Sequence, residues 1–183
     1  MYKNSLILVG GNRHGEDEPI QIIADYANKN KIKLFLITDK IHLNKPCKNF
    51  KTLKEFLKKK KIEFIEKKNL KDYKFFQNFI KNNPKSLFLS IFCFFKIQPK
   101  IIKLFSKKIF NYHIGKIPEQ IGASSSSWQL LTDQKETYLT FHRIEKEFDT
   151  GNIVYEKMFK LKNSEFCQEK YYNLIEKKRK NCF

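Results

Sequence analysis

The feature that most constrains the fold is a set of short, almost continuously apolar runs. Residues 5–9, 33–38 and 86–91 each place several branched or aromatic apolar side chains in succession. Such runs predict strands buried on both faces, which occur mainly in parallel sheets covered by helices. The segments between the runs carry apolar residues at helical spacing, so strands and helices are expected to alternate along the chain.

The other elements follow from the same patterns and from the turn residues. Helices are expected at residues 19–30, 52–61, 72–82, 99–105, 128–131 and 162–180, further strands at 62–65, 137–144 and 151–159, another strand ending before Gly115, and a loop at 39–50. A chain of 183 residues fits a single domain. The predicted fold class is α/β: a doubly wound, mostly parallel, Rossmann-like sheet with an antiparallel hairpin near the C-terminus.

The net charge of +18 raises the question of a nucleic-acid partner. Only Arg13, Arg143 and Arg179 among the 37 basic residues are arginines. Sequence-specific nucleic-acid sites favour arginine because its guanidinium makes bidentate contacts, so the many lysines indicate solvated helix faces instead. We therefore expect no specific nucleic-acid partner.

Cysteine spacing and hydropathy exclude further classes of protein. Cys47, Cys93, Cys167 and Cys182 form no C-x-x-C pair, so neither a metal site nor a disulfide framework is predicted. The longest apolar run, residues 87–95, is far shorter than the roughly 20 residues of a membrane span. No cleavable leader precedes the first strand, so we expect a cytoplasmic protein with no membrane partner.

Polar side chains emerge where one predicted strand runs into a loop. Asn111 and His113 are two residues apart and so share a face of the strand, and Gly115 and Pro118 end it. Ligands of open α/β sheets bind at such strand ends. An asparagine N–H can bind an oxyanion, worth about 3–4 kcal/mol, a histidine can move a proton, and a carboxylate can orient the imidazole. These groups suit attack of an amine on a carbonyl, although a structural histidine bonded to turn backbone would share this pattern.

Residues 110–154 contain further motifs in order. They are Phe110-Asn111-Tyr112-His113, Ile117-Pro118, Gly122, Trp128-Gln129-Leu130-Leu131, Lys135-Glu136-Thr137, Thr140-Phe141-His142 and Phe148-Asp149-Thr150-Gly151-Asn152-Ile153-Val154. This order resembles the N-x-H, L-P, G, W-A-L, E-T, T-x-H and D-T-G-D-I pattern of the folate-dependent formyltransferase family. The resemblance implies one formyltransferase-type catalytic domain over residues 1–183, with 10-formyltetrahydrofolate as formyl donor and no metal.

The resemblance also assigns roles to residues. It makes Asn111 the oxyanion donor, His113 the proton-transfer residue and Asp149 the carboxylate partner, which we expect to raise the pKa of His113. The cofactor-binding candidates are Phe94, Phe95, Lys96, Ile97, Glu147 and Phe148, and the substrate-binding candidates are Gly11, Asn12, Arg13, Ser124 and His142. Plain core packing is the alternative for the aromatic segment, as is a structural role for His142.

Two departures from the family pattern affect the acceptor. Ile114-Gly115 stands where the family usually has Pro-Ser, and Gln120-Ile121 stands where many members have an aromatic residue and an arginine. Methionyl-tRNA formyltransferases normally carry a further C-terminal domain that this sequence lacks. The expected acceptor is therefore the primary amine of an amino sugar nucleotide. The alternatives are glycinamide ribonucleotide, water in a hydrolase, or a non-catalytic folate- or nucleotide-binding domain, and the sequence is compatible with a homodimer.

Overall fold

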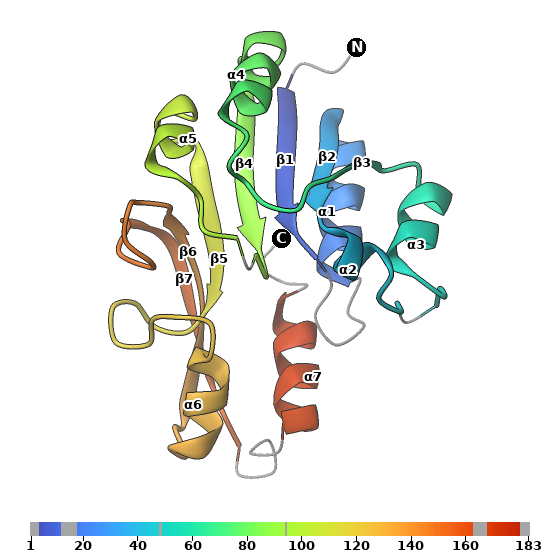
Figure 1. The fold of residues 1–183 in the computed structure, drawn as a ribbon. Helices are drawn as coiled ribbons and strands as arrows, with labels where there is room; N and C mark the ends of the chain where they lie inside the picture. The colour runs from blue at the N-terminus through green and yellow to red at the C-terminus, as the bar shows by residue number, and fades with distance from the viewer. Residues whose placement is uncertain (1–3, 12–17, 48, 94, 163–167, 180–183) are drawn as a thin grey trace. The chain divides into compact units, whose positions relative to one another are not determined.

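The computed structural model describes residues 4–11, 18–47, 49–93, 95–162 and 168–179 (Figure 1). The chain forms two compact units, Met1–Ile109 and Phe110–Phe183. The first unit holds the parallel strands and the second the antiparallel ones.

The first unit is built on four parallel strands in the order β3-β2-β1-β4. Their bounds are β1 (Asn4–Gly10), β2 (Ile32–Thr38), β3 (Glu63–Glu66) and β4 (Ser86–Ile91). In the central strand β1, the neighbours Ile7 and Leu8 point to opposite faces and are both buried, as a strand covered on both faces requires. The apolar runs thus predicted these strands correctly.

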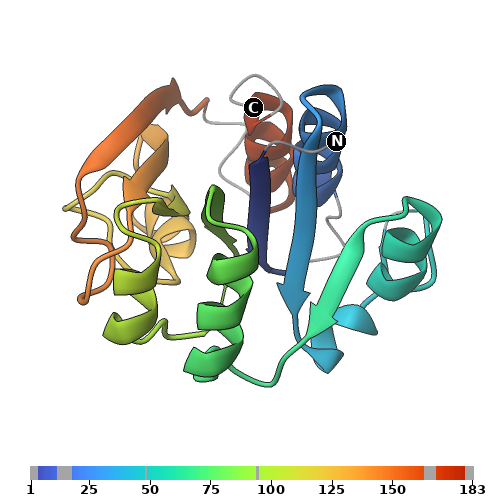
Figure 2. The ribbon, with the colours of Figure 1, turned by 90° about the horizontal axis from the view of Figure 1, so that it is seen from above.

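Helices cover both faces of these strands. Helix α1 (Glu18–Lys29) lies on one face, and α4 (Tyr73–Asn82) and α5 (Pro99–Leu104) lie on the other (Figure 2). Aromatic contacts join α4 and the end of α5 to the sheet. Phe76 of α4 packs on Phe88 of β4 at a ring-centroid distance of 6.3 Å, and Phe105, which follows α5, packs on Phe88 at 5.0 Å. Each fully buried phenylalanine contributes about 1.5–3 kcal/mol.

The segment expected to be a loop at residues 39–50 contains a short helix, α2 (Lys40–Leu43). The helix predicted at residues 52–61 follows it as α3 (Leu53–Lys59). The loop prediction was wrong for α2 because of a local cap. The Asp39 carboxylate accepts a 2.8 Å hydrogen bond from the His42 backbone N–H, which stabilises one helical turn after β2.

The second unit contains three antiparallel strands, β5 (Ile109–Ile114), β6 (Glu136–Arg143) and β7 (Ile153–Lys160). Helix α7 (Gln168–Arg179) buries Tyr171 and Ile175. The predicted α/β class, parallel strands followed by an antiparallel hairpin, is confirmed. In the described part of the chain, no helix has the length and apolar character needed to cross a membrane.

Helix α6 (Ser125–Leu131) buries a different face from the one that its apolar residues predict. Trp128 and Leu131 are 62% and 77% exposed, whereas the buried residues are Ser125, Ser126 and Gln129. The inner side offers polar partners to these buried groups. For example, the Ser125 hydroxyl donates to the Ile114 carbonyl at 2.6 Å. Ser124 does occupy the N-cap position, but its side chain makes no cap hydrogen bond.

Candidate active site

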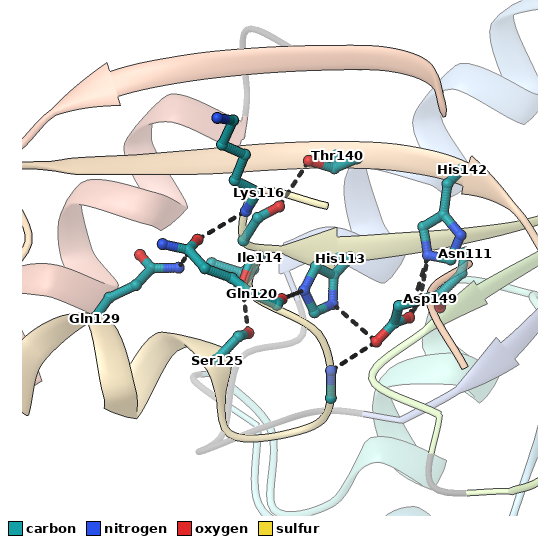
Figure 3. A network of polar contacts seen from close by, with 12 residues as sticks. Asn111, His113, Ile114, Lys116, Gln120, Ser125, Gln129, Thr140, His142 and Asp149 are labelled. Carbon is teal, nitrogen blue, oxygen red and sulfur yellow. Dashed lines mark hydrogen bonds and ion pairs between the residues drawn. The ribbon is translucent and has the colours of Figure 1, made fainter. Parts of the chain in front are cut away.

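Four polar groups of the second unit converge on the Asp149 carboxylate (Figure 3). Its Oδ2 accepts a 2.8 Å hydrogen bond from the Gly122 N–H and lies 3.8 Å from His113 Nδ1. Its Oδ1 accepts a 3.4 Å hydrogen bond from Asn111 Nδ2 and lies 3.3 Å from His142 Nε2. The structure therefore brings Asn111, His113 and Asp149 together.

Strand pairing explains how β5 and β6 supply three of these side chains. Asn111 lies directly opposite His142 in the antiparallel register, and His113 lies opposite Thr140. Residues two apart on a strand share a face, so Asn111, His113 and His142 all project to one side. This register is a long-range property that spacing within either strand does not reveal.

The loop between β6 and β7 delivers Asp149 to the same place. Asp149 adopts the left-handed conformation with φ 54°, and Gly151 packs directly against the end of β6. A Cβ on Gly151 would lie 1.9 Å from the Arg143 carbonyl oxygen, so only glycine fits there. The Arg143 N–H then donates to the Asn152 carbonyl at 3.0 Å, which holds the loop against the strand.

His113 is buried, and both of its ring nitrogens have defined surroundings. Nε2 lies 2.5 Å from the Gln120 carbonyl oxygen. A carbonyl can only accept, so Nε2 carries the proton of the neutral ring and Nδ1 faces Asp149. The distance of 3.8 Å between Nδ1 and the carboxylate exceeds that of a direct hydrogen bond.

His142 is also part of the cluster. Its Nδ1 donates to the Arg143 carbonyl at 2.8 Å, which leaves Nε2 to accept a 3.1 Å hydrogen bond from the Asn111 amide. Together with the contact to Asp149, this engages both N–H groups of the Asn111 amide. An oxyanion can bind to Asn111 only by displacing one of these two hydrogen bonds.

Burial governs the electrostatics of His113. Desolvation lowers its pKa below the ordinary value, and it outweighs the Asp149 charge and the Gln120 carbonyl, which both act to raise it. Asp149 thus acts on the pKa of His113 in the predicted direction, but burial reverses the net shift, because a charged ring is poorly solvated there. The neutral ring that results can accept a proton.

The pKa of Asp149 is lowered despite burial, which by itself would raise it. The approach of the two imidazoles, at 3.3 Å for His142 and 3.8 Å for His113, and the hydrogen bond from the Gly122 N–H together favour the ionised carboxylate. The cluster thus holds an anionic carboxylate beside a neutral imidazole, a combination that can receive a proton from an attacking nucleophile.

The remaining predicted site residues are spread over both units. In the first, Gly11 lies against the His42 ring after β1, Ile97 is buried, Phe95 is half-buried and Lys96 is exposed. In the second, Ser124, Glu147 and Phe148 are exposed. The predictions for Asn12, Arg13 and Phe94 lie outside the described residues.

Sequence analysis missed the glutamines that surround the His113 loop. Gln120 Oε1 accepts hydrogen bonds from the Lys116 N–H at 2.7 Å and from Gln129 Nε2 at 3.0 Å (Figure 3). Gln129 Oε1 in turn accepts from the Tyr171 hydroxyl at 2.8 Å. The only signal available was a glutamine within an otherwise apolar helical segment, which does not identify its partners.

This fold and cluster define a class of protein. Residues 6–183 match the model of the formyl transferase family, and the chain belongs to that family.

The chain is similar in sequence or in structure to several known formyltransferases. The chain is 26% identical over 174 residues to a methionyl-tRNA formyltransferase of Finegoldia magna, covering 94% of this chain and 55% of that protein. Among solved structures, it resembles phosphoribosylglycinamide formyltransferase from Bacillus halodurans with a TM-score of 0.77 and 16% identity, over 98% of this chain and 91% of the other. An N-formyltransferase from Helicobacter canadensis, in complex with folinic acid and dTDP-3-aminofucose, matches with a TM-score of 0.67 and 21% identity over 99% and 62% of the two chains.

The structural similarities establish the fold. The two structural matches, both below 25% identity, confirm the predicted Rossmann-like fold over nearly the whole chain. The chain spans about half the length of the curated methionyl-tRNA formyltransferases that it matches.

Proposed function

We propose that this protein transfers a formyl group from 10-formyltetrahydrofolate to a primary amine, in one catalytic domain spanning residues 1–183. The observation that carries the proposal is the convergence of Asn111 and His113 on the ionised Asp149 carboxylate. Membership of the formyl transferase family supports the reaction type.

The geometry assigns a task to each side chain in this reaction. The amine nitrogen attacks the formyl carbon, and one N–H of Asn111 exchanges its present partner for the developing oxyanion. The proton released from the nitrogen passes to the neutral His113 ring at Nδ1, the atom that faces Asp149. The carboxylate stabilises the imidazolium so formed. The oxyanion then re-forms the carbonyl, the bond between the formyl carbon and the folate nitrogen breaks, and the imidazolium gives its proton to that nitrogen.

For the donor, the residues after β4 supply a partly apolar segment. Ile97 is buried and Phe95 half-buried, as expected of a wall that contacts a planar ring. We propose Phe94, Phe95, Lys96 and Ile97 as the folate-binding residues of the first unit. In the second unit, we propose Glu147 and Phe148 for the same role.

For the acceptor, we propose the amine of an amino sugar nucleotide. Gln120-Ile121 replaces the aromatic-arginine pair that many family members have before the glycine, and the Gln120 side chain is bound within the protein. A loop without that arginine suits an acceptor other than the usual ones. Methionyl-tRNA is a second candidate, because the matched methionyl-tRNA formyltransferase covers 94% of this chain.

The test is a mass-spectrometric screen for a gain of one formyl group. The purified protein is incubated with 10-formyltetrahydrofolate and, separately, with amino sugar nucleotides, glycinamide ribonucleotide and methionyl-tRNA. We expect formylation of an amino sugar nucleotide, and formylation of methionyl-tRNA alone would transfer the acceptor proposal to the second candidate. Asn111→Ala, His113→Ala and Asp149→Ala should each lower turnover more than about tenfold.

A non-catalytic folate-binding domain is the rival reading. It predicts saturable folate binding with no formyl product from any acceptor. It also predicts that the three alanine variants bind folate with the same affinity as the unmodified protein. Asp133→Ala, on an exposed loop of the same unit, is the matched control and should behave as the unmodified protein.

A further inference from the structure

We propose that Gln120 is a positioning residue that holds His113 as the Nε2–H tautomer and so leaves Nδ1 as the proton-accepting atom. Its importance for turnover rests on the proposed formyl transfer, whereas the tautomer itself does not. The inference goes beyond the three residues that touch the reacting atoms, because Gln120 acts on the reaction only through His113.

The Gln120 backbone carbonyl binds His113 through Nε2. The Gln120 backbone carbonyl lies 2.5 Å from Nε2, and a carbonyl oxygen has no proton to donate. The neutral ring must therefore carry its proton on Nε2. The free lone pair is then on Nδ1, which lies 3.8 Å from the Asp149 carboxylate.

Four hydrogen bonds hold Gln120, and with it this carbonyl, in place. The Gln120 N–H donates to the Lys116 carbonyl at 2.7 Å, while the Gln120 side-chain oxygen accepts from the Lys116 N–H at 2.7 Å. Gln129 Nε2 donates to the same oxygen at 3.0 Å, and Gln120 Nε2 donates to Gln134 Oε1. The backbone alone supplies one of these contacts, and the side chain supplies the other three.

Gln129 is itself held from α7. The Tyr171 hydroxyl donates to Gln129 Oε1 at 2.8 Å and lies 2.9 Å from the Thr137 hydroxyl. Gln129 and Tyr171 are fully buried, so the amide is fixed with Nε2 toward Gln120. A chain of buried and part-buried hydrogen bonds thus reaches from α7 to the His113 ring.

Gly115 provides the room for this contact. A Cβ at Gly115 would lie 2.8 Å from His113 Nε2 and 2.9 Å from the Gln120 carbonyl oxygen, and its φ is +154°. A larger residue there would separate the two atoms. The Ile114-Gly115 departure from the family pattern therefore coincides with the position that the carbonyl needs.

Among the described residues, the titratable groups that face His113 are Asp149 from the β6–β7 loop and His142 from β6. The carboxylate acts to raise the pKa of His113, and His142, at a ring-centroid distance of 6.3 Å, acts to lower it. Neither is contacted by the Gln120 side chain. A change of that side chain therefore leaves both groups in place and removes the contacts that hold the Gln120 carbonyl, which stabilises the protonated ring.

The test is ¹⁵N NMR of the histidine side chains in the full chain, across a pH titration. His113→Gln assigns the His113 signals among those of the four histidines. We expect the unmodified protein to show a protonated Nε2 and a bare Nδ1 when His113 is neutral. In Gln120→Leu, we expect a mixture of tautomers and a lower pKa of His113. In Gln120→Glu, which retains an acceptor oxygen for the Lys116 N–H and for Gln129, we expect the unmodified tautomer.

Steady-state kinetics tests the link to turnover. Gln120→Leu should lower kcat about 10- to 100-fold, the scale of a misplaced catalytic group, with little change in KM. Glu119→Ala is the matched control because Glu119 lies on the same loop, is exposed, and pairs through its carboxylate with the Lys116 ammonium at 3.0 Å. It should leave tautomer, pKa and kcat unchanged.

Two results would overturn the proposal. One is an Nδ1–H tautomer of His113 in the unmodified protein, which needs no variant to fold. The other is a folded Gln120→Leu protein whose tautomer and pKa match those of the unmodified chain. A negative acceptor screen with the expected tautomer would refute the proposed function and leave the assignment of Gln120 to the His113 tautomer standing.

Discussion

Replacing Asp149 by asparagine tests the central carboxylate with the smallest change in shape. Asp149 is only 9% exposed at its side chain, so solvent screens its interactions weakly. Its two oxygens accept hydrogen bonds of 2.8 Å from the Gly122 N–H and 3.4 Å from Asn111. An asparagine side chain keeps one acceptor oxygen, places an N–H₂ group at the other position, and carries no charge.

The expected loss of stability follows from those contacts. A hydrogen bond to a charged group contributes about 1.5–3 kcal/mol, and a neutral one about 0.5–1.5 kcal/mol. Asp149→Asn converts the shorter bond to a neutral one and weakens the longer bond. We therefore expect the free energy of unfolding at pH 7 to fall by about 1–3 kcal/mol, measured by urea titration. Turnover should fall on the order of 10²- to 10⁴-fold, because the carboxylate no longer stabilises the imidazolium.

The pH dependence of the same variant follows from linkage. The Asp149 charge acts to raise the pKa of His113, so its removal should lower that pKa further. Below about pH 6.5, the unfolded chain then binds more protons than the folded variant, and the stability of the variant falls faster than that of the unmodified protein. The gap in stability should widen between pH 7 and pH 5. The contribution of the Asp149 charge itself is present above about pH 4 and is lost as the pH falls through its lowered pKa.

The control is Asp133→Asn, the same chemical change at a side chain that is 70% exposed. We expect it to alter stability by less than about 0.5 kcal/mol. If Asp149→Asn were as mild as this control, or if its gap narrowed between pH 7 and pH 5, the carboxylate would not be the electrostatic centre of the site.

Three further predictions concern neighbouring features. Because burial lowers the pKa of His113, its neutral form stabilises the fold fully above about pH 6.5 and progressively less as the pH falls, so His113→Gln should lose less stability than the unmodified protein between pH 7 and pH 5 in urea titrations. Gly151→Ala should lower the free energy of unfolding by about 1–3 kcal/mol, because its Cβ would overlap the Arg143 carbonyl, and a melting temperature equal to that of the unmodified protein would refute the close approach. Burial raises the pKa of Cys93 to about 11, so alkylation at pH 8, mapped by mass spectrometry, should leave Cys93 unmodified until the protein is unfolded.

Much of the fold was predictable because it depends on local periodicity. Residues 5–9, 33–38 and 86–91 are apolar on both faces, and that property alone requires helices on both sides of the strands that they form. Helix α6 shows the limit of such reasoning. Its pattern favours burial of Trp128, but polar partners on the inner side bury Gln129 instead.

For the site, the sequence by itself determined that Asn111 and His113 share one face of a strand and that Asp149 lies between two predicted strands, just before Gly151. Only the tertiary structure decided that the turn reaches those residues, through the contact of Gly151 with Arg143, and that strand register adds His142 to the cluster. It also decided the direction of the His113 pKa, because desolvation depends on everything packed around the ring. Spacing along the chain is a local quantity, whereas burial and register arise only when distant segments meet.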